Sequence, residues 1–142
     1  MNNKRYKPLI DKLYLILLIP TLLLIAALTV IVCFFPATAA IIITVCVDLT
    51  VIYFLISPLF GYVELREQSV FIKYGFILNK EIPYNKIRKL ERDRKFYSDS
   101  MMSLKNAFDH VNIKYNLYDV TTVSVVDNAG FIETVEKRIE NK

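Results

Sequence analysis

The segment between residues 84 and 99 is the most polar part of the sequence and carries its densest group of basic side chains. These basic residues are Lys86, Arg88, Lys89, Arg92, Arg94 and Lys95. Such side chains attract phosphate, and a cluster held beneath a bilayer gains about 1 kcal/mol per basic side chain from anionic lipid head groups. The segment is therefore a candidate membrane-surface site. The alternative is an ordinary solvated strand and loop, because Glu91, Asp93 and Asp99 cancel part of the charge.

Asp48 is the only formally charged residue in positions 13–63. An acid at the centre of a membrane helix costs about 2.5–3.5 kcal/mol on insertion scales, so Asp48 is expected to face a neighbouring helix rather than lipid. Thr44 lies four residues earlier on the same helical face, and Thr21 or Thr29 could approach from a second helix. The alternatives are a proton- or cation-sensing site, a contact with another membrane protein, or one hydrogen-bonded acid that its apolar neighbours tolerate.

Residues suited to catalysis or metal binding form no recognisable set. His110 is the only histidine, and no serine, cysteine or second histidine stands with it in a nucleophile arrangement. Cys33 and Cys46 lie in an apolar region and are interpreted as small buried hydrophobic residues rather than metal ligands. The sequence also has no glycine-rich phosphate loop. We therefore expect a protein that is not an enzyme, with no cofactor and no metal site.

The distribution of apolar residues predicts a membrane protein. The chain has 142 residues, of which 54% are hydrophobic. Residues 13–63 are far more than the roughly 20 helical residues that cross a bilayer core, and Pro36 lies close to their midpoint. We expect a hairpin of two transmembrane helices, about residues 13–35 and 37–60. A signal peptide cleaved near residues 37–39 is the alternative, but the apolar stretch exceeds the 7–15 residues typical of a signal core.

The positions of the basic residues predict how this hairpin is oriented. Four basic residues lie in positions 1–12, Arg66 and Lys73 follow the second helix, and the connecting turn has none. Basic residues collect on the cytoplasmic side of membrane proteins, so both termini are expected in the cytoplasm. The formal net charge of +4 provides no broad cationic surface, and nucleic acid is therefore not an expected partner.

Short alternating runs after residue 61 predict an antiparallel β-domain. Residues alternate with the period of two that is typical of strands along 62–65, 70–74, 76–82 and 111–115, and residues 120–126 are rich in the β-branched residues that strands favour. Residues 98–109 are expected to form a loop. Asp127 or Asn128 can cap a final helix. The apolar residues on one side of this helix are Phe131, Ile132, Val135 and Ile139.

The predicted fold class is an α+β membrane protein with three parts. A basic cytoplasmic N-terminus (1–12) precedes the transmembrane hairpin (13–60), and a small cytoplasmic β-domain with a C-terminal helix (61–142) follows it. A sheet closed by one amphipathic helix buries the apolar faces of both elements.

The order of these elements resembles that of bacterial pleckstrin-homology-like (PH-like) membrane proteins. The motifs that carry the resemblance are Tyr62-Val63-Glu64-Leu65, Val70-Phe71-Ile72-Lys73-Tyr74-Gly75, Ile82-Pro83-Tyr84-Asn85-Lys86-Ile87, Val111-Asn112-Ile113-Lys114-Tyr115 and Phe131-Ile132-Glu133. The resemblance implies a membrane anchor, a β-domain that ends in a helix, and a non-enzymatic role. Some members of this broad group resemble bacteriocin self-immunity proteins of the sublancin-immunity type. The basic lipid-binding pattern of eukaryotic PH domains is not matched by Arg66-Glu67-Gln68-Ser69, so phosphoinositide recognition is not implied.

Our leading interpretation is a non-catalytic interaction module anchored in the cell membrane. Its β-domain would bind a protein partner or anionic lipid head groups at the cytoplasmic face. The alternative is a bacteriocin self-immunity protein that protects the membrane of the producing cell. The expected partners are the lipid bilayer and either a membrane protein or a bacteriocin, and an oligomer is compatible with the sequence.

Overall fold

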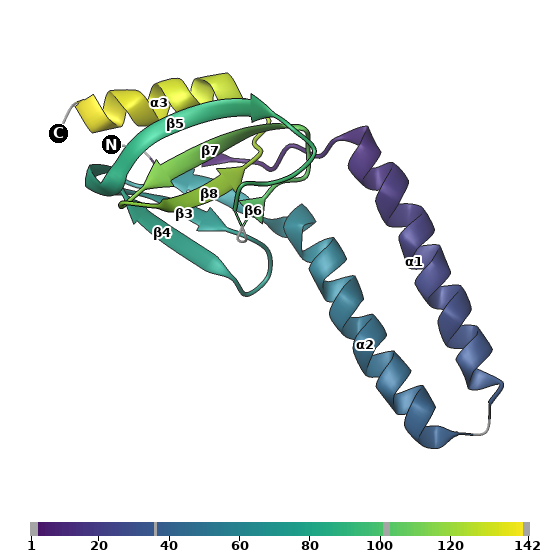
Figure 1. The fold of residues 1–142 in the computed structure, drawn as a ribbon. Helices are drawn as coiled ribbons and strands as arrows, with labels where there is room; N and C mark the ends of the chain where they lie inside the picture. The colour runs from purple at the N-terminus through teal and green to yellow at the C-terminus, as the bar shows by residue number, and fades with distance from the viewer. Residues whose placement is uncertain (1–2, 36, 101–102, 141–142) are drawn as a thin grey trace.

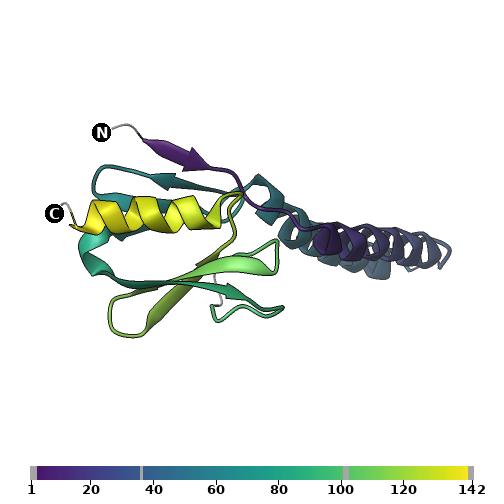
Figure 2. The same cartoon turned by 90° about the horizontal axis from the view of Figure 1, so that it is seen from above.

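The computed structural model describes residues 3–35, 37–100 and 103–140. Two long helices run side by side as a hairpin, and a domain of two sheets and one helix sits at the open end of this hairpin (Figure 1). A second view shows that the hairpin extends away from one end of the domain (Figure 2). The domain therefore has one end that joins the helices and an opposite end that points away from them.

The hairpin consists of α1 (Lys12–Cys33) and α2 (Thr38–Ile56), and a 3-10 helix, η1 (Ser57–Phe60), continues α2. Leucine, isoleucine and valine dominate both helices. By length and composition, α1 and the combined segment Thr38–Phe60 are each able to cross a membrane. Most of their large apolar side chains are exposed. Such a surface is unfavourable in water and suits a lipid environment.

One face of each helix is at least half-buried against the other helix. On α1 this face comprises Tyr14, Leu18, Leu22, Ile25, Thr29 and Val32. On α2 it comprises Ile41, Thr44, Asp48, Ile52 and Leu55. The spacing of three and four residues is that of packed helices. At the open end of the hairpin, the Tyr14 hydroxyl donates to the Leu55 carbonyl at 2.6 Å.

The first sheet contains a strand from before the hairpin. Its antiparallel order is β1 (Lys4–Tyr6), β2 (Tyr62–Leu65), β3 (Ser69–Lys73) and β4 (Asn79–Pro83). Strand β1 pairs with β2, with Lys4 opposite Leu65 and Tyr6 opposite Val63. Residues 4–6, which belong to the predicted basic N-terminus (1–12), thus form an edge strand of the sheet. Both long helices are inserted between two neighbouring strands.

The second sheet follows a short 3-10 helix, η2 (Tyr84–Lys86). It has the order β5 (Ile87–Arg94), β7 (Asp109–Tyr115), β8 (Asp119–Val123) and β6 (Ser103–Leu104), in which β6 runs parallel to β8. Helix α3 (Asn128–Glu140) closes the domain, and the Asp127 carboxylate caps it by accepting from the Gly130 amide at 2.9 Å.

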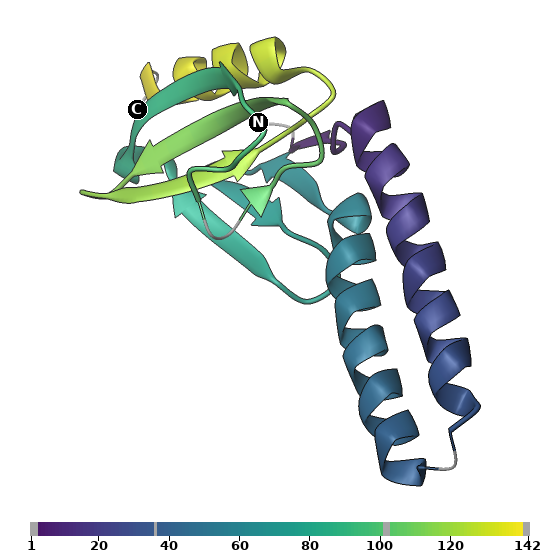
Figure 3. The same cartoon turned by 45° about the vertical axis from the view of Figure 1, so that its right-hand side comes forward.

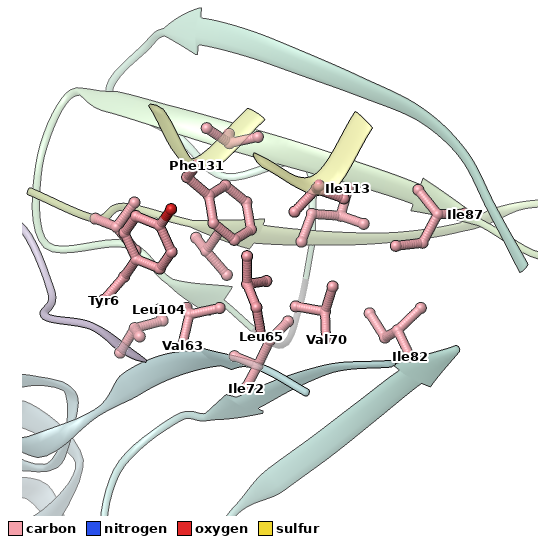
Figure 4. Packing of buried hydrophobic residues seen from close by; sticks show 14 of the residues in the cluster. Tyr6, Val63, Leu65, Val70, Ile72, Ile82, Ile87, Leu104, Ile113 and Phe131 are labelled. Atoms are coloured by element: carbon pink, nitrogen blue, oxygen red, sulfur yellow. The ribbon is translucent and has the colours of Figure 1, made fainter. Parts of the chain in front are cut away.

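The two sheets and α3 share one hydrophobic core (Figure 4). Alternation along the strands turns Val63, Leu65, Val70 and Ile72 inward, where all four are fully buried. Phe131 of α3 packs on this core from the other side. Its ring centroid lies 5.4 Å from that of Tyr6 on β1, and the two rings are edge to face. The core therefore depends on residues from both sides of the hairpin.

The predicted fold class is confirmed: two apolar helices precede antiparallel sheets and a C-terminal helix. Three local expectations differ from the structure. Strand β1 is not predicted. Residues 98–109 contain the short strand β6 as well as a loop. The strand expected over 76–82 begins at Asn79, because Phe76–Leu78 form a turn that the Tyr74 amide closes by donating to the Leu78 carbonyl at 2.9 Å.

Candidate interaction surfaces

The antiparallel strands give the domain two distinct ends. The near end joins the hairpin and contains the β3–β4 turn, the segment after β5 and the start of α3. The far end contains the β2–β3 turn, η2 and the β7–β8 turn, which lies away from the helices in Figure 1. Strand β5 runs from the far end to the near end, so its charged residues are divided between the two.

The six basic residues named from the sequence do not form one continuous surface. Lys86 ends η2, and Arg88 and Lys89 lie at the far end of β5, whereas Arg92, Arg94 and Lys95 lie at or just beyond its near end. At about 3.3 Å per residue, roughly 20 Å separates Arg88 from Arg94 along the strand. Each group must therefore be considered with its own neighbours.

Two of the three near-end basic residues are bound by acids. Arg92 donates to both carboxylate oxygens of Asp109 at 2.8 and 2.7 Å, and this contact holds the pKa of Asp109 below its usual value. Lys95 lies 2.6 Å from Asp93 and lowers the pKa of that carboxyl. In the described parts of the chain, Arg94 makes no ion pair.

Glu91, near the middle of β5, binds two lysines. Its carboxylate lies 2.7 Å from Lys114 Nζ and 2.8 Å from Lys89 Nζ. Hydrogen bonds from Lys114 and then Lys89 lower the pKa of Glu91 to about 2. Lys86 and Arg88 make no ion pair within the described ranges, and Arg88 donates only weakly to the Leu117 carbonyl at 3.4 Å. The positive charge that is not paired with an acid at the far end therefore comes from Lys86 and Arg88.

The β7–β8 turn beside Arg88 exposes two large side chains. Leu117 is 74% exposed and Tyr118 is 93% exposed. Asn116 supports the turn with a positive φ of 50° and donates from Nδ2 to Asp119 Oδ2 at 2.6 Å. A shallow hollow of about 320 Å³ lies between this turn and the start of β5. The far end thus combines exposed apolar groups with free positive charge, which sequence reasoning did not detect.

A second pair of hollows lies at the near end, beside the start of α1. The first, of about 210 Å³, is mainly apolar and lies between Tyr14 and Leu17 of α1 and Phe96 and Phe108 of the domain. The second, of about 630 Å³, is lined by three basic side chains, among them Lys12 and Arg94, and by three acidic ones. Lys12 and Arg94 are far apart in sequence and line the same hollow only because β1 places the start of α1 against the domain.

Inside the hairpin, Asp48 accepts a hydrogen bond from the hydroxyl of Thr29. The Thr29 hydroxyl also lies 2.9 Å from the Ile25 carbonyl. Thr21 instead donates to the Leu17 carbonyl of its own helix at 2.7 Å. Thr44 lies on the same half-buried face as Asp48. The acid thus has a polar partner on the opposite helix.

His110 is fully buried in β7, where Nδ1 lies 2.7 Å from the Phe108 carbonyl. Its Nε2 has no hydrogen-bond partner in the described structure. Within residues 3–35, 37–100 and 103–140, no three His, Cys, Asp or Glu side chains are grouped to hold a metal ion. The exposed surfaces at the two ends of the domain are therefore the strongest candidates for binding.

Two four-stranded sheets around one core, closed by a C-terminal helix, define a PH-like domain. The family model described as "Bacterial PH domain" matches residues 61–139, more than half of the chain. The protein belongs to this family. The matched segment begins after the hairpin, whereas the sheet in the structure also includes β1. No curated protein and no solved structure matches the chain.

Proposed function

We propose that this protein is a membrane-anchored, non-catalytic interaction module with both chain ends in the cytoplasm. The insertion of the hairpin between β1 and β2 is the observation that carries the proposal. Helix α2 leads through η1 into β2, and the five residues between β1 and α1 are bonded to the domain by the amides of Leu9 and Asp11, which donate to the carbonyls of Ser124 and Asn106 at 2.9 Å. The domain is therefore held at the membrane surface in one orientation rather than on a free linker. The basic residues before α1 and after η1 favour the cytoplasmic side.

The far end of the domain is the surface that we assign to a protein partner. It points away from the hairpin (Figure 1) and carries exposed Leu117 and Tyr118 beside Arg88. Tyrosine and arginine are enriched among residues that dominate protein interfaces. The expected partner segment carries carboxylates that can pair with Lys86 and Arg88 and an apolar side chain that packs on Leu117 and Tyr118.

Anionic lipid head groups are the second candidate ligand, and they suit the near end. Lys12 and Arg94 line one hollow beside the start of α1, at the level expected for head groups if α1 crosses the bilayer. The adjacent apolar hollow at Tyr14 and Leu17 could accept part of an acyl chain. Of the three acids in this hollow, Asp93 and Asp109 are already bound to Lys95 and Arg92 and oppose an incoming phosphate less strongly, so Lys12 and Arg94 have mainly Asp11 to offset.

Full-length protein with matched charge reversals separates these candidates. We would capture the tagged protein from native membranes in mild detergent, identify bound proteins, and quantify retained lipids by mass spectrometry. Arg88→Glu should release a protein partner and leave the amount of retained anionic lipid unchanged. Arg94→Glu should reduce the retained anionic lipid and leave the protein partner bound. If neither variant changes what is bound, the proposed surfaces are wrong.

Self-immunity against a membrane-targeting bacteriocin is the alternative implied by the family resemblance. It predicts that expression of the chain raises the survival of sensitive cells exposed to such a peptide. Protection that Arg88→Glu and Tyr118→Ala both abolish would indicate that the far end intercepts the toxin. Unchanged sensitivity at full membrane expression would leave the interaction module without an immunity role.

A further inference from the structure

The β3–β4 turn has an unusual composition for the tip of a hairpin. Three consecutive large apolar residues occupy it: Phe76 is 48% exposed, Ile77 73% and Leu78 50%. Exposed apolar runs of this kind are unfavourable on a water-facing surface and often mark a membrane contact. The β2–β3 turn, by contrast, is polar (Arg66-Glu67-Gln68), and the β7–β8 turn exposes two large side chains, Leu117 and Tyr118, that do not contact the hairpin. The tip therefore requires an apolar environment.

Ring contacts fix the position of this turn along the hairpin. The Phe76 ring lies 4.9 Å from the ring of Phe60 and 5.9 Å from that of Tyr53, measured between centroids. Figure 3 shows the β3–β4 turn beside the domain-facing part of α2. Tyr53 precedes Phe60 by seven residues, which corresponds to about 10 Å along a helix. Both belong to the segment Thr38–Phe60 that is able to span a membrane, so the turn lies alongside the last part of that segment.

The turn is also held firmly against the end of α2. The amide of Phe76 donates to Ser57 Oγ at 3.2 Å, and Ser57 is itself buried. A Cβ atom on Gly75, where φ is +158°, would lie 1.7 Å from Ser57 Oγ and 2.9 Å from the Ser57 carbonyl oxygen. Only glycine permits this close approach. The position of the turn along α2 is therefore fixed by its contacts with Ser57.

Positive charge lies behind the apolar tip. Lys73 ends β3 opposite Asn79, and Lys80 stands opposite Ile72 on β4. The Lys80 ammonium contacts the Tyr115 hydroxyl, and the Lys73 ammonium lies 5.8 Å from the centre of the Tyr62 ring. An apolar tip with a lysine at its base is the pattern of a segment that enters the acyl region while its charge remains among head groups.

We propose that Phe76, Ile77 and Leu78 insert into the inner leaflet beside α2, with Lys73 at head-group level. This inference rests on the proposed membrane span of the hairpin. The bilayer is the occupant because the tip is continuous with the exposed apolar surface of α2, through Phe60 and Phe54. The domain then has two attachments to the membrane, the hairpin and the turn, which together restrict its tilt.

Tryptophan fluorescence can measure the depth of the turn directly, because the chain contains no tryptophan. Full-length Ile77→Trp would be reconstituted into phosphatidylcholine–phosphatidylglycerol vesicles containing lipids brominated at defined acyl positions. Leu28→Trp, in the second half of α1, reports on the span, and Tyr118→Trp, in the far-end turn, is the water-exposed control. We expect Leu28→Trp to be quenched most by deep bromines, Ile77→Trp by bromines near the head groups, and Tyr118→Trp by neither.

The three positions distinguish failure of the inference from failure of the anchor. If Leu28→Trp is quenched and Ile77→Trp behaves like Tyr118→Trp, the span holds and the insertion of the turn is wrong. Emission from Ile77→Trp that is blue-shifted without quenching, and that depends on the protein-to-lipid ratio, would assign the turn to a second copy of the chain and would also overturn the inference. Absence of quenching at Leu28→Trp would overturn the membrane span itself.

Discussion

Tyr6 and Val63 are partners in one sheet although the entire helical hairpin lies between them in the chain. Tyr6 also packs its ring against Phe131 and places its hydroxyl 3.1 Å from the Thr134 hydroxyl of α3. Strand β1 therefore connects the edge of the first sheet to the helix that closes the domain. Stability of the domain and attachment of the hairpin are linked through this short strand.

Replacement of Tyr6 by alanine should reveal this link. The change removes a buried ring, and such truncations typically cost about 3–5 kcal/mol. We expect a marked fall in the midpoint of thermal unfolding of the detergent-solubilised protein. Arg5→Ala is the matched control, because Arg5 is exposed and its ion pair with Glu64 at 3.2 Å should contribute less than about 1 kcal/mol. Equal effects of the two substitutions would contradict the role assigned to β1.

Gly75→Ala tests the contact between the β3–β4 turn and the end of α2. The added Cβ would clash with Ser57, including its backbone oxygen, so the turn must move away from η1. We expect a loss of stability of about 1–3 kcal/mol and faster protease cleavage within residues 74–79. Asn79→Ala, at the exposed start of β4, should leave both the unfolding midpoint and the cleavage rate nearly unchanged.

The sequence predicts the elements that have a strong periodic signal. Residues 13–60 are apolar over a length that requires two helices, and Val63, Leu65, Val70 and Ile72 alternate clearly. Strand β1 gives no such signal, because Lys4 and Arg5 are exposed and only Tyr6 is buried. Phe76 and Leu78 continue the alternation of a strand, but their environment is the surface of α2, which a local pattern cannot specify.

For the candidate site, too, the sequence predicts the residues with a strong local signal but not their long-range contacts. Composition identifies all six basic residues of the 84–99 segment, but their partners come from other strands. Asp109 and Lys114 lie on β7, and each alters the charge that β5 presents. That Lys12 and Arg94 line the same hollow depends on the pairing of β1 with β2. These contacts are long-range, so residue type and local spacing do not predict them.

The two ion pairs of Glu91 should make stability depend on acid pH. The pKa of Glu91 is about 2 in the folded protein, below its ordinary value of 4.5. A carboxyl with a depressed folded pKa stabilises the protein above the unfolded pKa and loses that contribution as the pH falls through the folded value. We therefore expect the difference in unfolding midpoint between wild type and Glu91→Gln to shrink between about pH 5 and pH 2.

Ionic strength provides a control for the Glu91 prediction. Glu91 and its two lysines are close to solvent, so added salt should reduce the difference at neutral pH. Glu136→Gln serves as the matched carboxyl control, because no ion pair involves Glu136 in the described residues. A pH dependence that is identical in wild type and Glu91→Gln would assign the acid sensitivity to other groups.

The Thr29–Asp48 contact predicts a measurable coupling between the two helices. Hydrogen bonds between membrane helices average about 0.6 kcal/mol, with a maximum near 1.7 kcal/mol, in double-mutant cycles. We expect a coupling free energy in this range between Thr29→Ala and Asp48→Ala, measured by reversible unfolding in mixed micelles. Thr21→Ala is the matched control, since Thr21 bonds to its own helix and should show no coupling to Asp48.

Asp48→Asn separates a structural role for this acid from a charge-dependent one. An asparagine side chain can still accept a hydrogen bond from Thr29 through its amide oxygen, so the packing of α1 against α2 should persist. If the acid is only tolerated, Asp48→Asn should match wild type in oligomeric state and in capture of the partner. A loss of capture at unchanged unfolding midpoint would instead show that the carboxyl group itself takes part in function, as a proton- or cation-sensing site requires.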